Sequence, residues 1–316
     1  MNPGRQRVNN LDAERLYKTA GIEEALNDPQ TAHLTISHDK VVSSRSLPGL
    51  EVIAKEIKDG VDIKIVLNEG IVIKNPVHMC FGMLKKEGIQ RILLDIDIKR
   101  KAAISVLAHC IFPDAVKVQH IMDGKIKVGE GASYLYFEKH IHAETGGVEV
   151  YPKARVFLSD KARFKTEFEL LKGRVGKIFI DYETTCLKES VMEMTARISG
   201  RGDDIINIKE SGLLEGEGSR GVLTSRVAVR ENARAEVFNK LIATAPYARG
   251  HVDCKEIVQD KATASAVPIV EVKNPKAHIT HEAAIGSVDS KQLQTLMSRG
   301  LSEEEAVETI IKGLLS

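Results

Sequence analysis

The segment Glu130-Gly131-Ala132-Ser133 carries the pattern that decides the fold: a turn-forming pair, a small residue and then alternating apolar positions. The pattern recurs at 101–104, 152–155, 231–234, 260–263 and 275–278, and strands opened by Gly176 and Asp204 fill the long gap in this series. Successive copies are then 15 to 29 residues apart. Short strands and sharp turns at such steps are typical of a β-solenoid, in which each coil stacks on the previous one. We therefore expect a mainly β fold with a β-solenoid core.

The core is predicted to span residues 49–285, where almost every segment has the pattern of a strand or a turn. Near its start, residues 53–57 and 61–67 are apolar at alternate positions and flank Asp59-Gly60. Asp-Gly suits the positive φ angles of a tight turn, so this stretch predicts a β-hairpin. A β-sandwich with a similar number of strands is the alternative, but its turns recur about every 8–12 residues.

Helical segments are predicted at both ends of the core. In the N-terminal segment, residues 1–48, an amphipathic helix is expected over 11–26, and Asn27-Asp28-Pro29 ends it. In the C-terminal segment, residues 286–316, Asp289 with Gln292 and Ser302 with Glu305 have the spacing of capping boxes. The resulting αα-hairpin is expected either to cap the end of the solenoid or to offer a groove to a partner.

Composition excludes several classes of protein. Among 316 residues, 45 are basic and 44 acidic, giving a net charge of +1, so we expect no nucleic-acid partner. No apolar stretch approaches the roughly 20 residues that span a bilayer, and the first residues have no signal-peptide pattern. The four cysteines are scattered, as in a reduced cytoplasmic protein. Only 4% of residues are aromatic and none is Trp, which predicts a core filled by aliphatic side chains.

Motifs for common catalytic sites are missing from the sequence. There is no G-x-x-x-x-G-K-[ST] loop, so the chain is not itself a P-loop ATPase. The glycine-rich run at 211–218 follows no Rossmann pattern, and we interpret it as a loop. His281-Glu282 lacks the second histidine of an H-E-x-x-H zinc motif.

Histidines and one cysteine are the remaining candidates for chemistry. His140 and His142 share one face of a strand, as a metal pair does, although exposed strand histidines without a ligand are commoner. His278 and His281 lie on opposite faces, so only one of them can enter a common site. Cys254 lies in a polar stretch, where Arg249, His251 and Lys255 are expected to favour its thiolate. Since 27 residues separate Cys254 from His281, about one coil, they can lie on adjacent coils and form a soft metal site with a carboxylate.

At these residues the sequence resembles the SufB/SufD family. The segments A-P-Y-A-R-G-H-V-D-C at 245–254, A-T-A-S-A-V-P at 262–268, V-K-N-P-K-A-H-I-T-H-E-A at 272–283 and the ending at 292–306 are similar, in order and in spacing, to its C-terminal core. The resemblance is strong over 230–316 and collinear back to about residue 50. It implies a right-handed parallel β-helix that serves as a non-catalytic scaffold for iron–sulfur cluster assembly.

The resemblance also implies the site residues. Cys254 matches the cysteine that holds sulfur or cluster iron, and His281 and Glu282 match the H-E of an adjacent E-H-E segment, where Thr280 replaces the first glutamate. Family SufB chains carry a sulfur-accepting cysteine near 133–140, and this chain has none. The usual sulfur relay is therefore expected only if Cys186 or Cys254 receives sulfur directly.

Partners follow from the same resemblance. A SufC-type ABC ATPase is expected to bind the terminal helices and to hydrolyse the ATP, which this chain does not bind. The expected contact residues are Leu293, Leu296, Met297, Arg299, Leu301 and Ile310. Because the chain is shorter than typical SufB, we expect a homodimer that assembles a transient cluster, of the 4Fe–4S type, and passes it to apoproteins. Rival interpretations are a carbohydrate-active β-helix enzyme, which would need more aromatic residues, and a purely structural solenoid.

Overall fold

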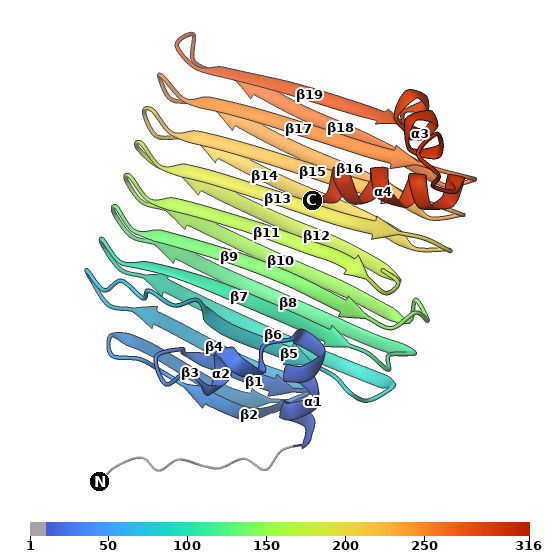
Figure 1. The fold of residues 1–316 in the computed structure, drawn as a ribbon. Helices are drawn as coiled ribbons and strands as arrows, with labels where there is room; N and C mark the ends of the chain where they lie inside the picture. Colours follow the sequence, from blue (N-terminus) through green and yellow to red (C-terminus); the bar gives the residue numbers. More distant parts are fainter. Residues whose placement is uncertain (1–10) are drawn as a thin grey trace.

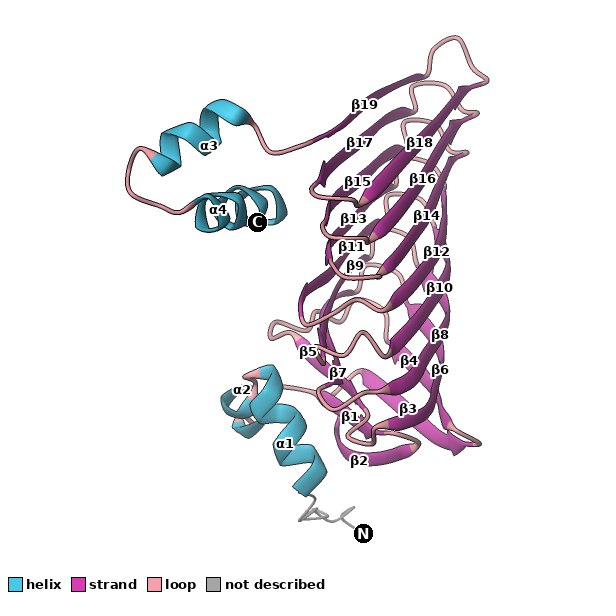
Figure 2. Cartoon of the chain, turned by 90° about the vertical axis from the view of Figure 1, so that its right-hand side faces the viewer, coloured by secondary structure: helices cyan, strands magenta, loops and turns pink. Residues whose placement is uncertain are grey.

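Two facing β-sheets dominate the computed structural model, which describes residues 11–316 (Figures 1 and 2). Sheet A has the order β19-β17-β15-β13-β11-β9-β7-β5-β1-β2, and sheet B has the order β18-β16-β14-β12-β10-β8-β6-β4-β3. The strands of sheet A are β1 (His33–Ser37), β2 (Lys40–Arg45), β5 (Val77–Gly82), β7 (Ala103–Phe112), β9 (Ser133–His142), β11 (Arg163–Lys172), β13 (Val191–Gly200), β15 (Arg220–Val229), β17 (Arg249–Val258) and β19 (His278–Gly286). The strands of sheet B are β3 (Leu50–Ile57), β4 (Gly60–Leu67), β6 (Glu87–Ile98), β8 (Lys117–Val128), β10 (Val148–Leu158), β12 (Lys177–Cys186), β14 (Ile205–Leu214), β16 (Arg234–Ala243) and β18 (Thr263–Val272).

The chain winds as a parallel β-solenoid, which confirms the predicted fold. From β4 onwards the strands alternate between the two sheets, and each pairs in parallel with the strand one coil away. Ala103 pairs with Ser133, Ser133 with Arg163 and Arg163 with Val191, so a coil takes 28 to 30 residues. A sandwich of antiparallel strands is excluded, because among the described residues only β1–β2 and β3–β4 pair antiparallel.

The hairpin predicted around Asp59-Gly60 is present. Strands β3 and β4 pair antiparallel, with Leu50 opposite Leu67 and Ile57 opposite Gly60. Asp59 has a φ of 58°, in the left-handed region that such a tight turn requires.

The repeat is more regular than the sequence pattern indicated. Positive φ angles recur at equivalent turn positions before the strands of sheet A: Lys101, Gly131, Lys161, Glu189, Gly218 and Tyr247. One of the predicted copies was wrong, because 152–155 lies inside β10 and is no turn. Pro152 has no backbone N–H, and the pairing of β10 with β12 skips this position. The steps between the predicted copies were uneven because one copy lies inside a strand and the others belong to turns before strands of either sheet.

The interior between the sheets is filled mainly by aliphatic side chains. Alternate residues of each strand point inwards, as in β12, where Ile178, Ile180 and Tyr182 are buried. One continuous cluster of buried apolar residues extends from Ala32 to Ala262. This filling agrees with the low aromatic content, because stacked β-branched residues pack well on a pleated surface.

At the N-terminal end, helices α1 (Leu11–Ala20) and α2 (Glu23–Asn27) precede the sheets. The predicted single helix is interrupted at Gly21, which has a φ of 69°. The description of residues 1–48 as helical was wrong beyond Asn27, because β1 joins sheet A beside β5 and β2 pairs with β1. Residues 1–10 lie outside the described part. Leu16 of α1 packs against Cys80 and Ile111.

Helices α3 (Ser290–Met297) and α4 (Glu303–Leu315) follow the last strand. Both predicted N-terminal caps are present: Asp289 accepts a hydrogen bond from the Gln292 N–H, and Ser302 and Glu305 form a capping box. The expectation that this hairpin covers the end of the solenoid was wrong, since α4 lies along the outer face of sheet A (Figure 2). Its Ile311 and Leu315 bury Ala228 of β15 on this outer face, and Ile257 of β17 packs against the same cluster.

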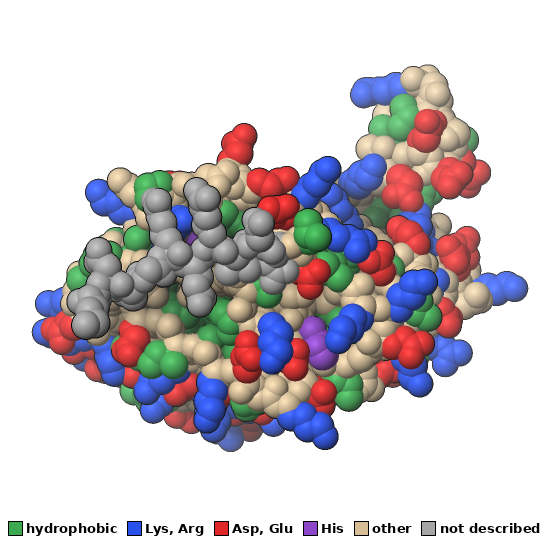
Figure 3. All heavy atoms as spheres, turned by 90° about the horizontal axis from the view of Figure 1, so that it is seen from below, with side chains coloured by type: hydrophobic (Ala, Val, Ile, Leu, Met, Phe, Trp, Pro, Cys, Tyr) green, Lys and Arg blue, Asp and Glu red, His purple; other side chains and the backbone are tan. Residues whose placement is uncertain are grey.

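The two ends of the solenoid differ in the side chains they expose, because α3 and α4 leave the C-terminal end uncovered. At the C-terminal end, most residues of β18 and β19 are exposed or half-buried, including inward-facing ones such as Val272 and Ile285. At the N-terminal end, acidic and basic side chains are interspersed on the visible surface (Figure 3). None of the helices in residues 11–316 is long and apolar enough to cross a membrane.

Candidate functional site

Cys254 lies inside the solenoid, one coil below its open end. The buried residues of β17 alternate, so Val252, Cys254 and Glu256 face the interior. Cys254 is fully buried, and its Sγ lies 3.5 Å from Nδ2 of Asn239, which comes from the facing sheet. Cys254 is therefore an interior residue rather than part of an exposed site.

The prediction that neighbouring cations favour the thiolate was wrong. Arg249, His251 and Lys255 alternate with the inward residues and lie on the outer face, so they do not surround the sulfur. Burial raises the pKa of the Cys254 thiol above its ordinary value, because an apolar interior disfavours the charged form. A hydrogen bond with Ser225 opposes this effect, and the net result is a protonated thiol at neutral pH.

His281 lies on the strand next to Cys254, as its spacing in the sequence predicted. In the pairing of β17 with β19, Val252 is opposite His281 and Cys254 is opposite Ala283. His281 therefore shares the inward face with Cys254, offset by two residues along the strand. It is exposed because no further coil covers β19. His278 faces the other side, as predicted, since an odd number of residues separates the two histidines.

Glu282 lies on the outer face and does not join Cys254 within one chain. It is opposite Asp253, and one of its carboxylate oxygens is 3.5 Å from the Nζ atom of Lys255. Thr280 faces the same way, with its hydroxyl 2.8 Å from Nδ1 of His251. The alternation of side chains along β19 thus separates His281 from its two neighbours.

Three polar residues around Cys254 were not predicted. Ser225, Asn239 and Glu256 are all buried, and together with Cys254 we call them the end pocket. Ser225 donates a hydrogen bond of 3.2 Å to Glu256, whereas Oδ1 of Asn239 and Oε2 of Glu256 have no partner in the described part of the chain. Burial raises the pKa of Glu256 to about 7. Cys254 and Ser225 are 29 residues apart, which is one coil, and lie opposite each other on adjacent strands. A more regular repeat assignment in the sequence would therefore have predicted this pair.

A second polar group lies in the middle of the solenoid. Cys110 of β7, His120 of β8 and Glu138 of β9 are buried, and one potential metal-ligating atom of each lies within 4.8 Å of the others. The Sγ atom of Cys110 is 3.7 Å from both Nε2 of His120 and Oε1 of Glu138. We call these three residues the interior group. No sequence motif marks this group, because its members come from both sheets.

The predicted histidine pair adjoins this group. His140 and His142 share a face of β9, as expected, but both are buried rather than exposed. Nδ1 of His142 is 3.0 Å from the Arg174 carbonyl, so it donates, and its Nε2 then accepts from Nδ1 of His140 at 3.1 Å. Nε2 of His140 is left to accept from a protonated Glu138, 2.8 Å away.

The same assignment agrees with the pKa shifts. Burial lowers the pKa of His140 and of His142 to about 3, so both rings are neutral. Burial raises the pKa of Glu138, which favours the protonated carboxyl group that the hydrogen bonds require. Without a cation, the polar residues of this region are uncharged.

The other cysteines have no reactive surroundings. Cys186 is fully buried, and burial raises its pKa to about 12. The alternative in which Cys186 receives sulfur directly therefore has no accessible thiolate. Cys80 lies under α1, and burial also raises its pKa to about 12.

Comparison with known proteins decides the family. A family model described as "SUF system FeS cluster assembly, SufBD core domain" matches residues 94–314. This range extends from β6 to α4 and contains both polar groups. The chain belongs to the SufBD family. The resemblance seen in the sequence is thereby confirmed.

Relatives of this SufBD-family chain occur in archaea and bacteria. An iron–sulfur cluster assembly SufBD family protein of Methanocaldococcus jannaschii is 36% identical over 302 residues, 96% of each chain. Another, of Pyrococcus horikoshii, is 36% identical over 300 residues, 95% of this chain and 91% of that protein. The iron–sulfur cluster assembly protein SufB of Bacillus subtilis is 28% identical over 165 residues, 42% of this chain and 35% of that protein.

The terminal helices of the SufBD-family chain present the residues predicted to bind a partner. Leu293 and Leu296 are half-buried, Met297 is 42% exposed, and no residue of α3 is buried. On α4 and the loop before it, Leu301 and Ile310 are half-buried, whereas Arg299 is exposed. Helix α3 stands away from the sheets (Figure 2), so its apolar side chains have little cover.

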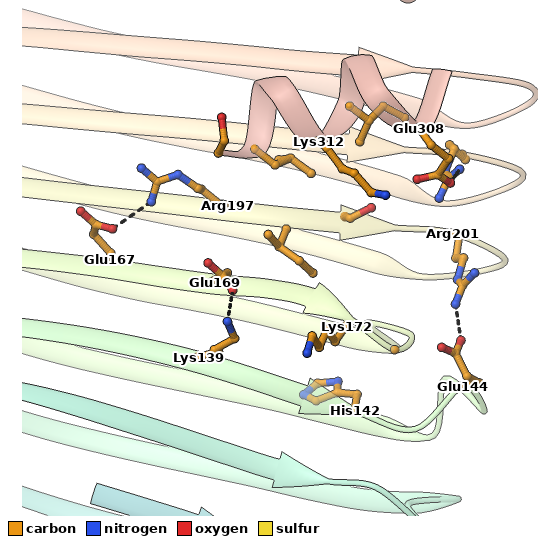
Figure 4. Close-up of a pocket in the computed structure, with 17 residues that line it drawn as sticks. Lys139, His142, Glu144, Glu167, Glu169, Lys172, Arg197, Arg201, Glu308 and Lys312 are labelled. Carbon is orange, nitrogen blue, oxygen red and sulfur yellow. Dashed lines mark hydrogen bonds and ion pairs between the residues drawn. The ribbon is translucent and has the colours of Figure 1, made fainter. Parts of the chain in front are cut away.

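A groove of about 1050 Å³ lies beside α4 on the outer face of sheet A (Figure 4). Charged residues of both signs line it, and several are already paired, such as Lys139 with Glu169 at 2.9 Å and Arg197 with Glu167 at 3.0 Å. His142 also lines this groove, so the hydrogen-bonded series from Glu138 reaches its wall. Six lysines and arginines and four glutamates line the groove, so it does not carry charge of one sign alone.

Proposed function

We propose that this SufBD-family chain is a non-catalytic scaffold on which an iron–sulfur cluster is assembled as cargo. The observation that carries the proposal is the position of Cys254 and His281 on adjacent strands, both on the inward face, at the uncovered end of the solenoid. A thiolate and an imidazole are suitable ligands for iron. The cluster is transient, of the 4Fe–4S type, and passes to apoproteins in the cytoplasm.

The proposed site lies near the interface of a homodimer. Strands β18 and β19 end their sheets with unpaired edges, and inward apolar residues such as Val272 and Ile285 are 46% and 45% exposed. Exposed edges and apolar ends of this kind are normally covered by further structure. A second copy would cover both and bring two sets of Cys254 and His281 together. Glu282 faces away from Cys254 within one chain, so it enters the ligand set only at this interface.

A SufC-type ATPase is the proposed partner of the terminal helices. The half-buried and exposed apolar residues of α3 are available for contact, and α4 connects them to β15 through Ile311 and Leu315. ATP binding and hydrolysis occur in the partner, since this chain has no P-loop. Movement of the helices on ATP binding would pull on sheet A close to Cys254, whose buried thiol must become accessible to accept sulfur and iron.

Anaerobic reconstitution with iron and sulfide tests the cluster ligands. We expect the wild-type chain to develop the visible absorption of an iron–sulfur cluster, and Cys254→Ser to abolish it. Cys186→Ser, which replaces a buried thiol two coils away, is the matched control and should keep the spectrum. An unchanged spectrum in Cys254→Ser would leave a purely structural solenoid as the better interpretation.

Binding to a purified SufC-type ATPase tests the partner surface. Met297→Glu should weaken this binding strongly, whereas Gln294→Glu on the same helix should not. Both positions are exposed, so neither change disturbs the fold. Binding of Met297→Glu as tight as that of Gln294→Glu would show that α3 is not the contact.

The proposed dimer interface is tested by Ile285→Glu, which should convert the dimer to a monomer in light scattering. An unchanged mass would contradict the proposed interface.

A further inference from the structure

The interior group is placed by three neighbouring strands of the solenoid. Cys110 and Glu138 are on β7 and β9, adjacent in sheet A, where Ala108 is opposite Glu138 and Cys110 is opposite His140. Their side chains are thus two positions apart on the inward face. His120 comes from β8 in sheet B and reaches them across the interior, with its Nε2 directed at the sulfur of Cys110. The fold itself brings together one sulfur, one nitrogen and one carboxylate.

The spacing of these atoms fits a single metal ion. Zinc binds sulfur at about 2.3 Å and nitrogen or oxygen at about 2.0–2.2 Å, so tetrahedral ligands lie about 3.6 Å apart. The distances from Sγ of Cys110 to Nε2 of His120 and to Oε1 of Glu138 are both 3.7 Å. The remaining nitrogen-to-oxygen distance is within 4.8 Å and closes with small side-chain rotations. An ion between the three atoms would therefore need little movement of the backbone.

The surroundings favour an ion of charge +2. Phe112 and Phe81 pack 5.1 and 6.5 Å from the ring of His120, and all three ligands are buried. A Cys110 thiolate and a Glu138 carboxylate neutralise exactly two positive charges, which lowers the cost of burying the complex. Within residues 11–316 the Nδ1 atom of His120 has no hydrogen-bond partner, so this ring is poorly satisfied as an ordinary core residue.

The residues around Glu138 are arranged like an outer ligand shell. Nε2 of His140 lies 2.8 Å from Oε1 of Glu138 and carries no proton in the metal-free chain, so it can take the carboxyl proton when an ion binds and then donate to the carboxylate, while Nδ1 donates to His142. The hydroxyl of Tyr182 lies 3.4 Å from the other carboxylate oxygen. Such contacts orient a ligating carboxylate in known metal sites.

We propose that Cys110, His120 and Glu138 bind one borderline-soft divalent transition metal ion, Zn²⁺ or Fe²⁺. Mixed sulfur, nitrogen and oxygen ligands select such ions over Mg²⁺ and Ca²⁺, which prefer oxygen alone. Binding releases the proton of the Cys110 thiol to solvent and moves the proton of the Glu138 carboxyl group to Nε2 of His140. Three protein ligands leave a fourth position open. This site is separate from Cys254 and stands even if Cys254 does not hold a cluster.

Cobalt substitution tests the site in the full-length chain. Because the ligands are enclosed, the protein should be produced in medium containing Co²⁺, so that the ion is present while the chain folds. A Cys254→Ser background keeps any cluster ligated by Cys254 out of the measurement. We expect one cobalt ion per chain by mass spectrometry, and the charge-transfer absorption of a cobalt–thiolate bond.

Further changes in this background decide the outcome. Cys110→Ser should remove the charge-transfer band, and Glu138→Gln, which preserves the shape of the side chain, should remove most of the metal. Cys186→Ser should change neither. Far-UV circular dichroism of the metal-free variants shows whether each is folded. If Cys110→Ser does not fold, the metal content of Glu138→Gln decides the outcome. Absence of cobalt from the folded parent, or retention of band and metal in both variants, would overturn the proposal.

Discussion

The solenoid interior holds two polar regions of similar composition in opposite surroundings. The interior group has Cys110 and Glu138 on adjacent strands of sheet A, and the end pocket has Cys254 and Glu256 on the same sheet. Glu138 and Cys254 occupy one ladder, four strands apart, or about 19 Å at 4.8 Å per strand. Coils cover the interior group on both sides, whereas one exposed coil covers the end pocket. Its distance from the end of the solenoid therefore suits the interior group to retaining an ion, whereas the end pocket is better placed to release a bound group.

Apolar residues separate these two regions along sheet A. Phe168 and Ala196 lie between Glu138 and Ser225 on the shared ladder, and both are buried. On sheet B a polar route remains: Tyr182, Glu210 and Asn239 are opposite one another on successive strands. Tyr182 contacts Glu138 and Asn239 contacts Cys254. The comparison predicts different stability, reactivity and pH dependence for the middle and for the end.

The largest expected effect comes from removing a buried ring between the two regions. Phe168 is 2% exposed and packs 4.7 Å from the ring of His140. Phe168→Ala should lower the free energy of unfolding by about 3–5 kcal/mol, because it leaves a cavity in a filled core. Ile285→Ala at the open end should cost less than about 1 kcal/mol in the monomer. Urea unfolding followed by circular dichroism measures both, and equal losses would show that the end is packed like the middle.

Thiol reactivity should show the next largest difference. Both Cys254 and Cys110 are fully buried, so alkylation of either requires local opening. Opening the last coil exposes Cys254, whereas exposure of Cys110 requires opening of the middle. In metal-free protein we expect iodoacetamide to modify Cys254 roughly 100-fold faster, a difference of about 3 kcal/mol in opening free energy. Mass spectrometry of the cysteine peptides gives the rates, and similar rates would contradict the comparison.

The polar route on sheet B predicts a pH dependence. Burial raises the pKa of Glu210 from its ordinary value of 4.5 to about 8. Between these two values the folded chain binds one proton more than the unfolded chain, so stability is full below pH 4.5 and decreases as the pH rises to about 8. At about 1.4 kcal/mol per pH unit, this carboxyl group costs about 2–3 kcal/mol between pH 6 and pH 8.

Glu210→Gln should remove this loss. The variant is expected to show a flatter decline of unfolding free energy between pH 6 and pH 8 than the wild type. Glu236→Gln, on the exposed face of the neighbouring strand β16, is the control and should leave the slope unchanged. If the slopes of wild type and Glu210→Gln coincide, Glu210 is solvated or paired.

Sequence reasoning located the end of the solenoid better than its interior. The 27-residue spacing of Cys254 and His281 sufficed, because a coil of about 29 residues places such positions on adjacent strands. It failed for the environment of Cys254: the polar neighbours that indicated a thiolate lie on the outer face. Strict alternation along β17 separates Arg249 and Lys255 from the sulfur, a consequence of strand geometry that composition alone does not convey.

The interior group could not be predicted from the spacing of residues in the sequence. Cys110 and Glu138 are 28 residues apart, close to one coil, but His120 reaches them from the opposite sheet. Its position depends on the lengths of the turns between β7, β8 and β9, which fix how the two sheets face each other. Motifs such as H-E-x-x-H are readable because one helix carries both ligands. A site assembled from three strands of two sheets has no such signature.

The smallest expected effect concerns the turns that set the coil length. Lys161 and Glu231 have φ angles of 59° and 60°, a conformation that costs a residue with a Cβ about 1 kcal/mol and costs glycine little. Gly131 already occupies the position equivalent to Lys161 one coil earlier. Glycine also gains freedom in the unfolded chain, which offsets part of the benefit. The net gain for Lys161→Gly should therefore be about 0.5 kcal/mol.

The corresponding change near the end should give less. The turn at Glu231 leads into β16, which is next to the exposed last strand of sheet B. If the last coils open before the middle unfolds, strain relieved at Glu231 contributes to the local opening and only partly to global unfolding. Lys161→Gly should then raise the urea midpoint, whereas Glu231→Gly should mainly slow hydrogen exchange in β16. Equal shifts of the midpoint would mean that the solenoid unfolds as one unit. The contrast between the interior group and the end pocket would then rest only on their distance from the exposed last coil.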